Sequence, residues 1–223
     1  KFRRGLMLRQ FMSGIPSGIT EMSPGIVTFI FNRFIVTFMH DRELIIYSIL
    51  SYVILLATVL ANGIAQGAQP LVSYYHGRHE RDTFHTIFGY EIRSGLILAV
   101  LEIAVVLVFG NYIAMLFVND GDALILEVSY ALRLIALAFP MLSMNIIIAG
   151  YLTALERSRV AVIISLMRCT LTILLSLALI ATMLGVSYVW LSLAVSEMLS
   201  MIAAVLLYRK TRRVAIAETF DDM

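Results

Sequence analysis

The chain has 223 residues, of which 60% are hydrophobic and 14% are charged, and its mean hydropathy is +0.89. A soluble domain has roughly 45 to 50% apolar and about 25% charged residues, so this composition excludes such a domain and predicts a protein that folds in the lipid bilayer. The single cysteine, Cys169, excludes a disulfide framework and a thiolate zinc site. The net charge of +2 matters less than where the basic residues lie.

Six segments of the chain are long and apolar enough to span a bilayer, which takes about 20 residues in a helix. They predict an all-α membrane protein whose six transmembrane helices occupy residues 1–213, followed by a cytoplasmic tail at 214–223. The predicted helices cover about 11–38, 44–72, 84–109, 123–154, 160–183 and 187–208. Because several are longer than one span, we expect tilted or kinked helices.

Basic residues near the ends of these helices are distributed unevenly. Twelve fall in the segments on the same side as the N-terminus, whereas the opposite side carries only Arg42, next to acidic residues. Cytoplasmic loops are enriched in Lys and Arg, so both ends of this chain are predicted to be cytoplasmic. The same distribution requires an even number of spans, and it places the protein in the cell (cytoplasmic/inner) membrane.

The first predicted helix gathers its small and polar residues on one face when it is projected at about 100° per residue. These residues are Gly14, Ser17, Gly18, Glu21, Gly25, Thr28 and Asn32. In lipid such a face turns toward the bundle interior or a wet cavity. Glu21 is therefore either a buried structural acid or part of a functional site.

Two prolines, Pro16 and Pro24, lie on either side of Glu21. Pro24 has no N–H, so the carbonyl of Thr20 is left free beside the Glu21 carboxylate, and the two kinds of oxygen form a candidate cation site. An ionisable residue near the bilayer centre costs roughly 2.5 to 3.5 kcal/mol on insertion scales, which favours a function over simple packing.

The stretch 62–77, Asn-Gly-Ile-Ala-Gln-Gly-Ala-Gln-Pro-Leu-Val-Ser-Tyr-Tyr-His-Gly, closes the second predicted helix. Gly63 and Gly67 are four residues apart, which predicts the close approach of another helix. Pro70 is expected to end the regular helix and to kink it. Near this kink three amide side chains are candidate site residues: Asn62, Gln66 and Gln69. The alternative is a packing kink without a ligand.

This stretch resembles the multidrug and toxic compound extrusion (MATE) transporters, in particular their bacterial drug-efflux branch. Weaker similarities follow along the chain: Gly14-Ile-Pro16, Arg168, Val189-Trp190-Leu191 and Ser196-Glu197. Those transporters have twelve helices in two related lobes. The resemblance therefore implies that this chain is the second, C-terminal lobe, and that its partner is a missing N-terminal six-helix lobe.

The resemblance implies secondary active export of amphipathic or cationic drugs in exchange for Na⁺ or H⁺. It assigns the coupling ion or the substrate to the acid on the first helix of this lobe, here Glu21. The implied partners are small organic molecules and the lipid bilayer, with no nucleic acid and no cofactor besides the coupling ion. Alternatives are a lipid-linked oligosaccharide flippase of similar architecture, whose cavity should be richer in arginine, and a structural membrane subunit that does not transport.

Two further polar residues inside predicted helices are ambiguous. Glu102 lies about seven residues from the outer end of the third helix and is either a site residue or a structural partner. Asn145, in the middle of the fourth helix, either contacts a substrate or bonds a neighbour. By contrast, Glu91 and Arg93 lie at the cytoplasmic end of the third helix and are predicted to anchor it at the membrane surface.

Arg168 and Glu197 lie at matching depths on the fifth and sixth helices, which are adjacent and antiparallel. Either charge alone would be unsatisfied in hydrocarbon, so the two are predicted to form an ion pair with a structural role.

Catalytic motifs are missing from the sequence. It has no Gly-x-x-x-x-Gly-Lys-Ser/Thr loop and no Gly-x-Ser-x-Gly turn, and His76 and His79 have no carboxylate at the spacing of a metal site. The protein is therefore expected not to be an enzyme and to hold no metal.

Overall fold

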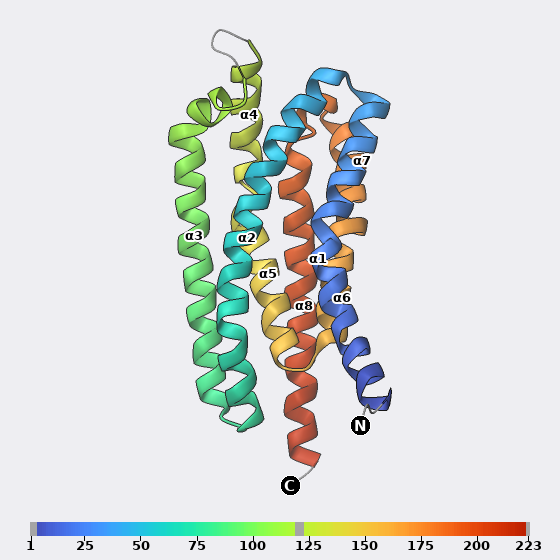
Figure 1. The fold of residues 1–223 in the computed structure, drawn as a ribbon, viewed down its shortest axis with the longest axis vertical. Coiled ribbons are helices and arrows are strands. Elements are labelled where there is room, and N and C mark those ends of the chain that lie inside the picture. Colours follow the sequence, from blue (N-terminus) through green and yellow to red (C-terminus); the bar gives the residue numbers. More distant parts are fainter. Residues whose placement is uncertain (1–3, 119–122, 222–223) are drawn as a thin grey trace.

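The computed structural model describes residues 4–118 and 123–221, and the chain forms a bundle of long, roughly aligned helices (Figure 1). Three helices are continuous: α1 (Arg4–Phe38), α2 (Asp41–Gly77) and α3 (Arg81–Met115). The next two rods are interrupted, and they consist of α4 (Ala123–Ala136) with α5 (Phe139–Ala154), and of α6 (Ser158–Leu166), the π-helical turn η1 (Met167–Leu171) and α7 (Thr172–Met183). A short turn, η2 (Val186–Tyr188), leads to α8 (Leu191–Asp221).

Four helices in the described part of the chain are each long and apolar enough to cross a membrane: Asp41–Gly77, Arg81–Met115, Arg159–Met183 and Leu191–Arg209. The pair α4 and α5 passes the same test together, which gives up to five spans, and α1 adds the shorter apolar segment Pro24–Phe38. The chain is thus a multi-pass, all-helical membrane protein, as its composition predicts.

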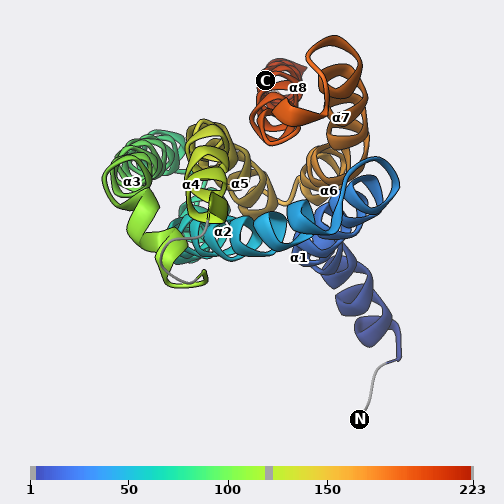
Figure 2. The same cartoon turned by 90° about the horizontal axis from the view of Figure 1, so that it is seen from above.

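The helix α5 lies at the centre of the bundle (Figure 2). It packs against α2, α3, α6 and α8, while α1 packs against α2, α6 and η1. Seen from above, α2 to α5 form one group and α1 with α6 to α8 form another, and they meet where α1 lies beside α2 and where α5 lies beside α6 and α8. The candidate site residues come from helices on both sides of this junction.

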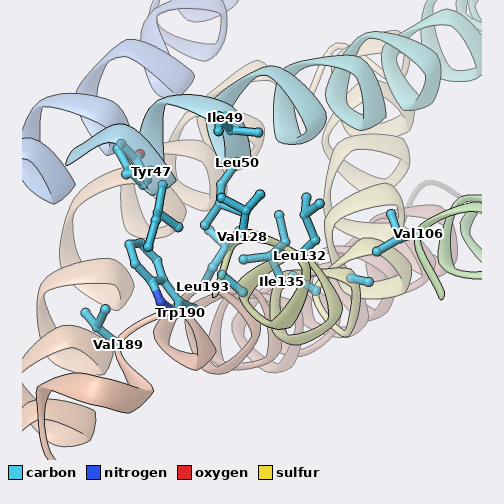
Figure 3. Close-up of a cluster of buried hydrophobic side chains, with 14 of the residues drawn as sticks. Tyr47, Ile49, Leu50, Val106, Val128, Leu132, Ile135, Val189, Trp190 and Leu193 are labelled. Carbon is cyan, nitrogen blue, oxygen red and sulfur yellow. The ribbon is translucent and has the colours of Figure 1, made fainter. Parts of the chain in front are cut away.

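Around the α1–α2 connection the two groups share an apolar core (Figure 3). Tyr47 stacks on Phe31 with ring centroids 4.8 Å apart, and on Trp190 with centroids 6.5 Å apart. Leu50, Leu132 and other buried aliphatic side chains fill the space beside these rings. In a bilayer the hydrophobic effect does not drive helices together, so such close packing supplies much of the cohesion between them.

The predicted fourth helix, 123–154, is broken in the structure. The helices α4 and α5 meet at an angle of 45°, and the N–H of Ala138 bonds to the carbonyl of Ile135 at 2.8 Å in a tight turn. Pro140 explains the break, because it has no N–H to donate to the carbonyl of Ala136 and its ring displaces that carbonyl.

The rod between Ser158 and Met183 is mostly apolar, yet it contains one wide turn at η1. The N–H of Thr172 bonds to the carbonyl of Met167, five residues earlier. The Thr172 hydroxyl lies 3.1 Å from the carbonyl oxygens of both Met167 and Arg168. Turns of this kind often occur at functional sites in α-helices, and this one carries Arg168.

Two local predictions for the second helix are wrong. The helix α2 is not ended by Pro70 and continues to Gly77. A Cβ added at Gly63 or Gly67 would meet nothing within 4 Å, so the described chain brings no helix close to them. The close approach to α2 occurs instead at Gly150 of α5, where an added Cβ would lie 3.1 Å from the Cβ of Ala65.

The beginning of α1 and the end of α8 lie at the same end of the bundle (Figure 1). The helix α8 extends to Asp221, so most of the segment predicted as a tail, 214–223, is helical. The α1–α2 connection lies at the opposite end. The position of a residue along the bundle is given below by its distance from these two ends.

Candidate functional site

A cavity of about 630 Å³ with a mixed polar and apolar lining lies between α1, α2, α5, α6 and η1. Five of the residues predicted to form a site line it together: Glu21, Asn62, Gln66, Gln69 and Asn145. Of the two other residues of that prediction, Glu102 is described below, and the side chain of Thr20 lies outside the described part of the structure. The cavity is also lined by Arg168, which was predicted only as part of an ion pair.

Glu21 is exposed on the cavity side of α1. Its nearest bonded partner is the amide of Gln66, whose Nε2 donates to Oε1 of Glu21 at 3.5 Å. This bond joins α1 to α2, but it is at the upper limit of hydrogen-bond length and is therefore weak. Among the described residues this is the hydrogen bond that the Glu21 carboxylate accepts, and it leaves other positions on the two oxygens open to a ligand.

The amides of α2 reach the cavity because of their spacing. Asn62, Gln66 and Gln69 are separated by four and three residues, which places them on one face of a helix. Ala65, on the neighbouring strip of that face, contacts Gly150 of α5. The small side chains therefore hold α2 and α5 together beside the cavity, while the amides supply donors and acceptors inside it.

Asn145 and Glu197 form a buried hydrogen-bonded unit between α5 and α8. Nδ2 of Asn145 donates to Oε2 of Glu197 at 2.7 Å and to the backbone carbonyl of Glu197 at 3.1 Å. Two acceptors on one side fix the orientation of the amide, since its oxygen would be repelled there. Oδ1 of Asn145 therefore points away from Glu197, and it is buried without a partner in the described chain.

Arg168 approaches the other oxygen of Glu197. Its Nε lies 3.2 Å from Oε1, with side-chain exposures of 13% for Arg168 and 5% for Glu197. The N–H at Nε is not directed at the carboxylate, because that nitrogen makes no hydrogen bond within the described structure. The two charges are thus adjacent at the depth that the sequence predicts, although the contact is electrostatic rather than a well-aligned hydrogen bond.

A group of hydroxyls beside this pair was not anticipated. Thr172 lies 3.0 Å from the hydroxyl of Ser196 and 2.9 Å from that of Ser200, and all three are buried. Serine and threonine are common between packed membrane helices, so their presence in the sequence does not indicate that these three meet. They join α7 to α8 next to the wide turn that carries Arg168.

Glu102 lines neither this cavity nor the smaller one described below. It lies on α3 between Gly95, which faces Ile147, and Gly110, which faces Ser129, and so at the level of the α4–α5 break. Both of its carboxylate oxygens are buried without a hydrogen-bond partner in the described residues.

The prediction that Glu91 anchors α3 at the membrane surface is wrong, because Glu91 is only 4% exposed. It lies on the same face of α3 as the buried Gly95 and Ala99. Arg93 is exposed, as an anchoring residue requires.

The cavity combines an open carboxylate with four amides and one guanidinium. Such a lining binds a small cation through oxygens, or a polar organic molecule through hydrogen bonds. Within residues 4–118 and 123–221, no group of three or more His, Cys, Asp or Glu side chains is arranged to hold a metal ion.

Residues 16–178 match the sequence profile of a family described as MatE. The chain belongs to this family. The match spans most of the bundle, from the proline before Glu21 to the middle of α7, and it includes every predicted site residue except Glu197. No curated protein matched the chain in sequence.

Solved structures of MATE transporters have the same fold. A crystal structure of MATE in complex with MaL6 has a TM-score of 0.87 at 16% identity, and the match covers 98% of this chain and 49% of that one. An outward-facing multidrug resistance MATE family transporter of the MOP superfamily gives 0.86 at 17% identity, with coverages of 98% and 49%. The Vibrio cholerae MATE transporter VcmN in its bent form gives 0.84 at 18% identity, with 96% and 48%.

This MatE-family chain thus spans about half the length of the transporters that it resembles. At these identities the similarity establishes the fold, which is that of a membrane transporter. The substrate and the coupling ion have to be argued from the residues of the cavity itself.

Proposed function

We propose that this chain is the C-terminal half of a multidrug antiporter, which exports amphipathic or cationic organic compounds in exchange for Na⁺ or H⁺. The observation that carries this proposal is Glu21, an exposed acid on a membrane helix that opens into a 630 Å³ cavity. A charged residue inside a membrane helix is costly, and a carboxylate held by one weak bond is better placed to bind an ion than to stabilise the fold.

In this proposal a proton or Na⁺ binds Glu21 and changes which arrangement of the transporter is favoured. An ion can do so only if it binds one arrangement more tightly than the other. Gln66 supports this role, because it joins the Glu21 carboxylate to α2 and would feel its change of charge. Apolar and amide side chains on α2 and α5 would then contact the organic substrate.

The cavity argues against the two alternatives. A flippase for a lipid-linked oligosaccharide must bind several phosphate charges, whereas the described lining of this cavity has one arginine, Arg168, already beside Glu197. A purely structural subunit has no use for a polar cavity open to an acid that makes one weak bond.

We further propose that the open side of the cavity faces a second six-helix lobe, because the matched transporters are twice as long. Transport would come from rocking of the two lobes about the site. The proposed partners are small organic compounds, the second lobe and the lipid bilayer. The proposal requires no cofactor besides the coupling ion, Na⁺ or H⁺.

The proposed location is the inner cell membrane, with both ends of the chain in the cytoplasm, in agreement with the distribution of basic residues. A single cysteine introduced at Asp41, in a Cys169→Ser background, should react with an impermeant thiol reagent added outside intact cells. A cysteine at His79 should not react. Labelling in the opposite pattern would reverse the orientation.

Substitution of Glu21 by Gln tests the coupling role directly. The full-length transporter is reconstituted in liposomes, and drug uptake is driven by an imposed Na⁺ or H⁺ gradient. Glu21→Gln keeps the size of the side chain and its bond to Gln66 but removes its charge, so gradient-driven transport should fall to the level of empty liposomes.

The matched control is Glu156→Gln, which changes an exposed acid in the α5–α6 connection that does not line the cavity. This variant should transport at the wild-type rate. Wild-type transport by Glu21→Gln as well would remove Glu21 from the mechanism and make Glu102 the next acid to test.

A further inference from the structure

A second, smaller cavity of about 220 Å³ lies next to the first. It is nearer to the α1–α2 connection, because its α2 residues, such as Tyr47 and Ser51, precede those of the large cavity. Four residues line both cavities: Pro24, Leu55, Thr58 and Arg168. The two spaces are therefore neighbours along the axis of the bundle and share one wall.

The polar part of that wall consists of Asn145, Arg168 and Glu197, which we call the partition. Asn145 lines the large cavity, Glu197 lines the small one, and Arg168 lines both. The three are connected by the contacts of 2.7 Å between Asn145 and Glu197 and of 3.2 Å between Arg168 and Glu197.

Hydroxyl groups continue the polar lining on the far side of the partition. The small cavity is lined mainly by apolar residues, and Thr28, Tyr47, Ser51 and Glu197 add polar groups to this lining. On the near side, Oδ1 of Asn145 is buried without a partner in the described chain. Oxygen atoms that accept from water or bind a small cation are thus present on both sides.

Arg168 is the one basic side chain among the described residues that line either cavity. Its guanidinium stands where the two spaces meet, and Glu197 compensates its charge only from the α8 side. A fixed positive charge at a narrow point opposes the passage of protons and other cations, as it does in selective membrane pores.

We propose that the two cavities form a route for protons or Na⁺-sized cations through this half of the transporter, and that the partition is the barrier that closes it. The route leads from the small cavity, on the α1–α2 side of the partition, to the cavity that contains Glu21. Organic substrates are excluded from it, because the small cavity has about a third of the volume of the large one.

The loose geometry at Arg168 fits a barrier that opens during transport. Its Nε–H is not aligned with Glu197, so moving the guanidinium breaks no well-formed bond at that nitrogen. The wide turn η1 carries Arg168, and turns of this kind are frequent at functional sites. An ion pair with a purely structural role would not have to lie between two cavities.

The test is a leak measurement on the full-length transporter in liposomes, without any drug. A membrane potential is imposed, and entry of H⁺ or Na⁺ is followed with an internal dye for each ion. The principal variant is Arg168→Gln with Glu197→Gln, which removes the barrier charge without leaving a buried partner unpaired. We expect entry of at least one of the two ions to be roughly tenfold faster than in wild type, because the guanidinium between the two cavities is replaced by a shorter, neutral side chain.

Two variants make the result specific. Arg168→Lys keeps the positive charge and should leak no more than wild type. Arg133→Gln removes an exposed arginine of α4 that lines neither cavity, and it should also remain tight. A folded double variant that admits neither H⁺ nor Na⁺ faster than wild type would overturn the proposal, and so would an equal leak through Arg168→Lys.

The destination of the route, Glu21, rests on the proposed coupling function, but the barrier can be tested apart from it. The leak is measured again with Glu21→Gln added to the double variant. A leak that persists supports the barrier whether or not Glu21 couples transport. Loss of driven transport in Glu21→Gln together with a tight double variant would retain the proposed function and reject the barrier.

Discussion

The two acids nearest the large cavity are held in contrasting ways. Glu21 is exposed and receives one bond of 3.5 Å from Gln66, whereas Glu197 is buried and is held by Asn145 at 2.7 Å and by Arg168 at 3.2 Å. Glu197 lies on a helix long and apolar enough to cross a membrane, whereas Glu21 directly precedes the apolar segment Pro24–Phe38 of α1. Glu197 is thus part of the buried framework, whereas the exposed Glu21 is the acid to which the proposed function assigns an ion.

The largest loss of stability is expected when the buried pair of Arg168 and Glu197 is disrupted. Glu197→Ala or Arg168→Ala alone leaves one buried charge unpaired, which should lower the free energy of unfolding by roughly 3 to 5 kcal/mol. Exchange of the two, Arg168→Glu with Glu197→Arg, should restore part of the loss. The measurement is the yield and thermal stability of folded protein in detergent. A double exchange no better than the worse single variant would show that the two residues are not partners.

A smaller loss of stability is expected when the amide side chains that donate to the two acids, Asn145 and Gln66, are removed. Asn145→Ala removes a buried donor to a charged oxygen and should cost about 1.5 to 3 kcal/mol, seen as a lower thermal midpoint.

Gln66→Ala is the matched variant on the other acid and should change the unfolding free energy by no more than about 0.5 kcal/mol, because its bond is long and exposed. A loss at Gln66 as large as that at Asn145 would contradict the contrast between a fixed acid and an available one.

Much of the cavity lining could be predicted from helical spacing and polarity. Asn62, Gln66 and Gln69 share a face because of their separations of four and three residues, and Glu21 lies on the single polar face of an otherwise apolar helix. In a bilayer a polar face has few places to turn except inward, so these residues had to meet a common interior space. Which ion or molecule occupies that space does not follow from the same reasoning.

The contacts between helices were harder to foresee. The spacing of Gly63 and Gly67 shows that a helix is able to approach, but it carries no information on whether one does, and the contact is made by Gly150 with Ala65 instead. Likewise Glu91 looked like a surface anchor from its distance to the loop, yet α3 turns it inward on the same face as Gly95. Rotation of a helix about its axis depends on its neighbours, which a single sequence does not specify.

The α4–α5 break and the wide turn η1 could hardly be predicted from the hydropathy of the sequence. The break between α4 and α5 has Pro140 as a physical cause, but the apolar run continues across it. The wide turn at Met167–Leu171 has no proline or glycine, and it was missed entirely. The depth of Arg168 was nevertheless predictable, because one extra residue in a turn changes the position along the axis by only about 1.5 Å.

The wide turn at Arg168 also affects how this protein should be aligned with others of its family. A lobe that lacks the turn needs one residue fewer to cover the same height, and a sequence comparison would then show a gap of a single position. Beyond that gap, a register based on motif spacing would match side chains that differ by about 100° around the helix. The counterpart of Arg168 in another transporter is therefore to be identified by superposing the bundles, with Glu197 and Asn145 as the fixed points.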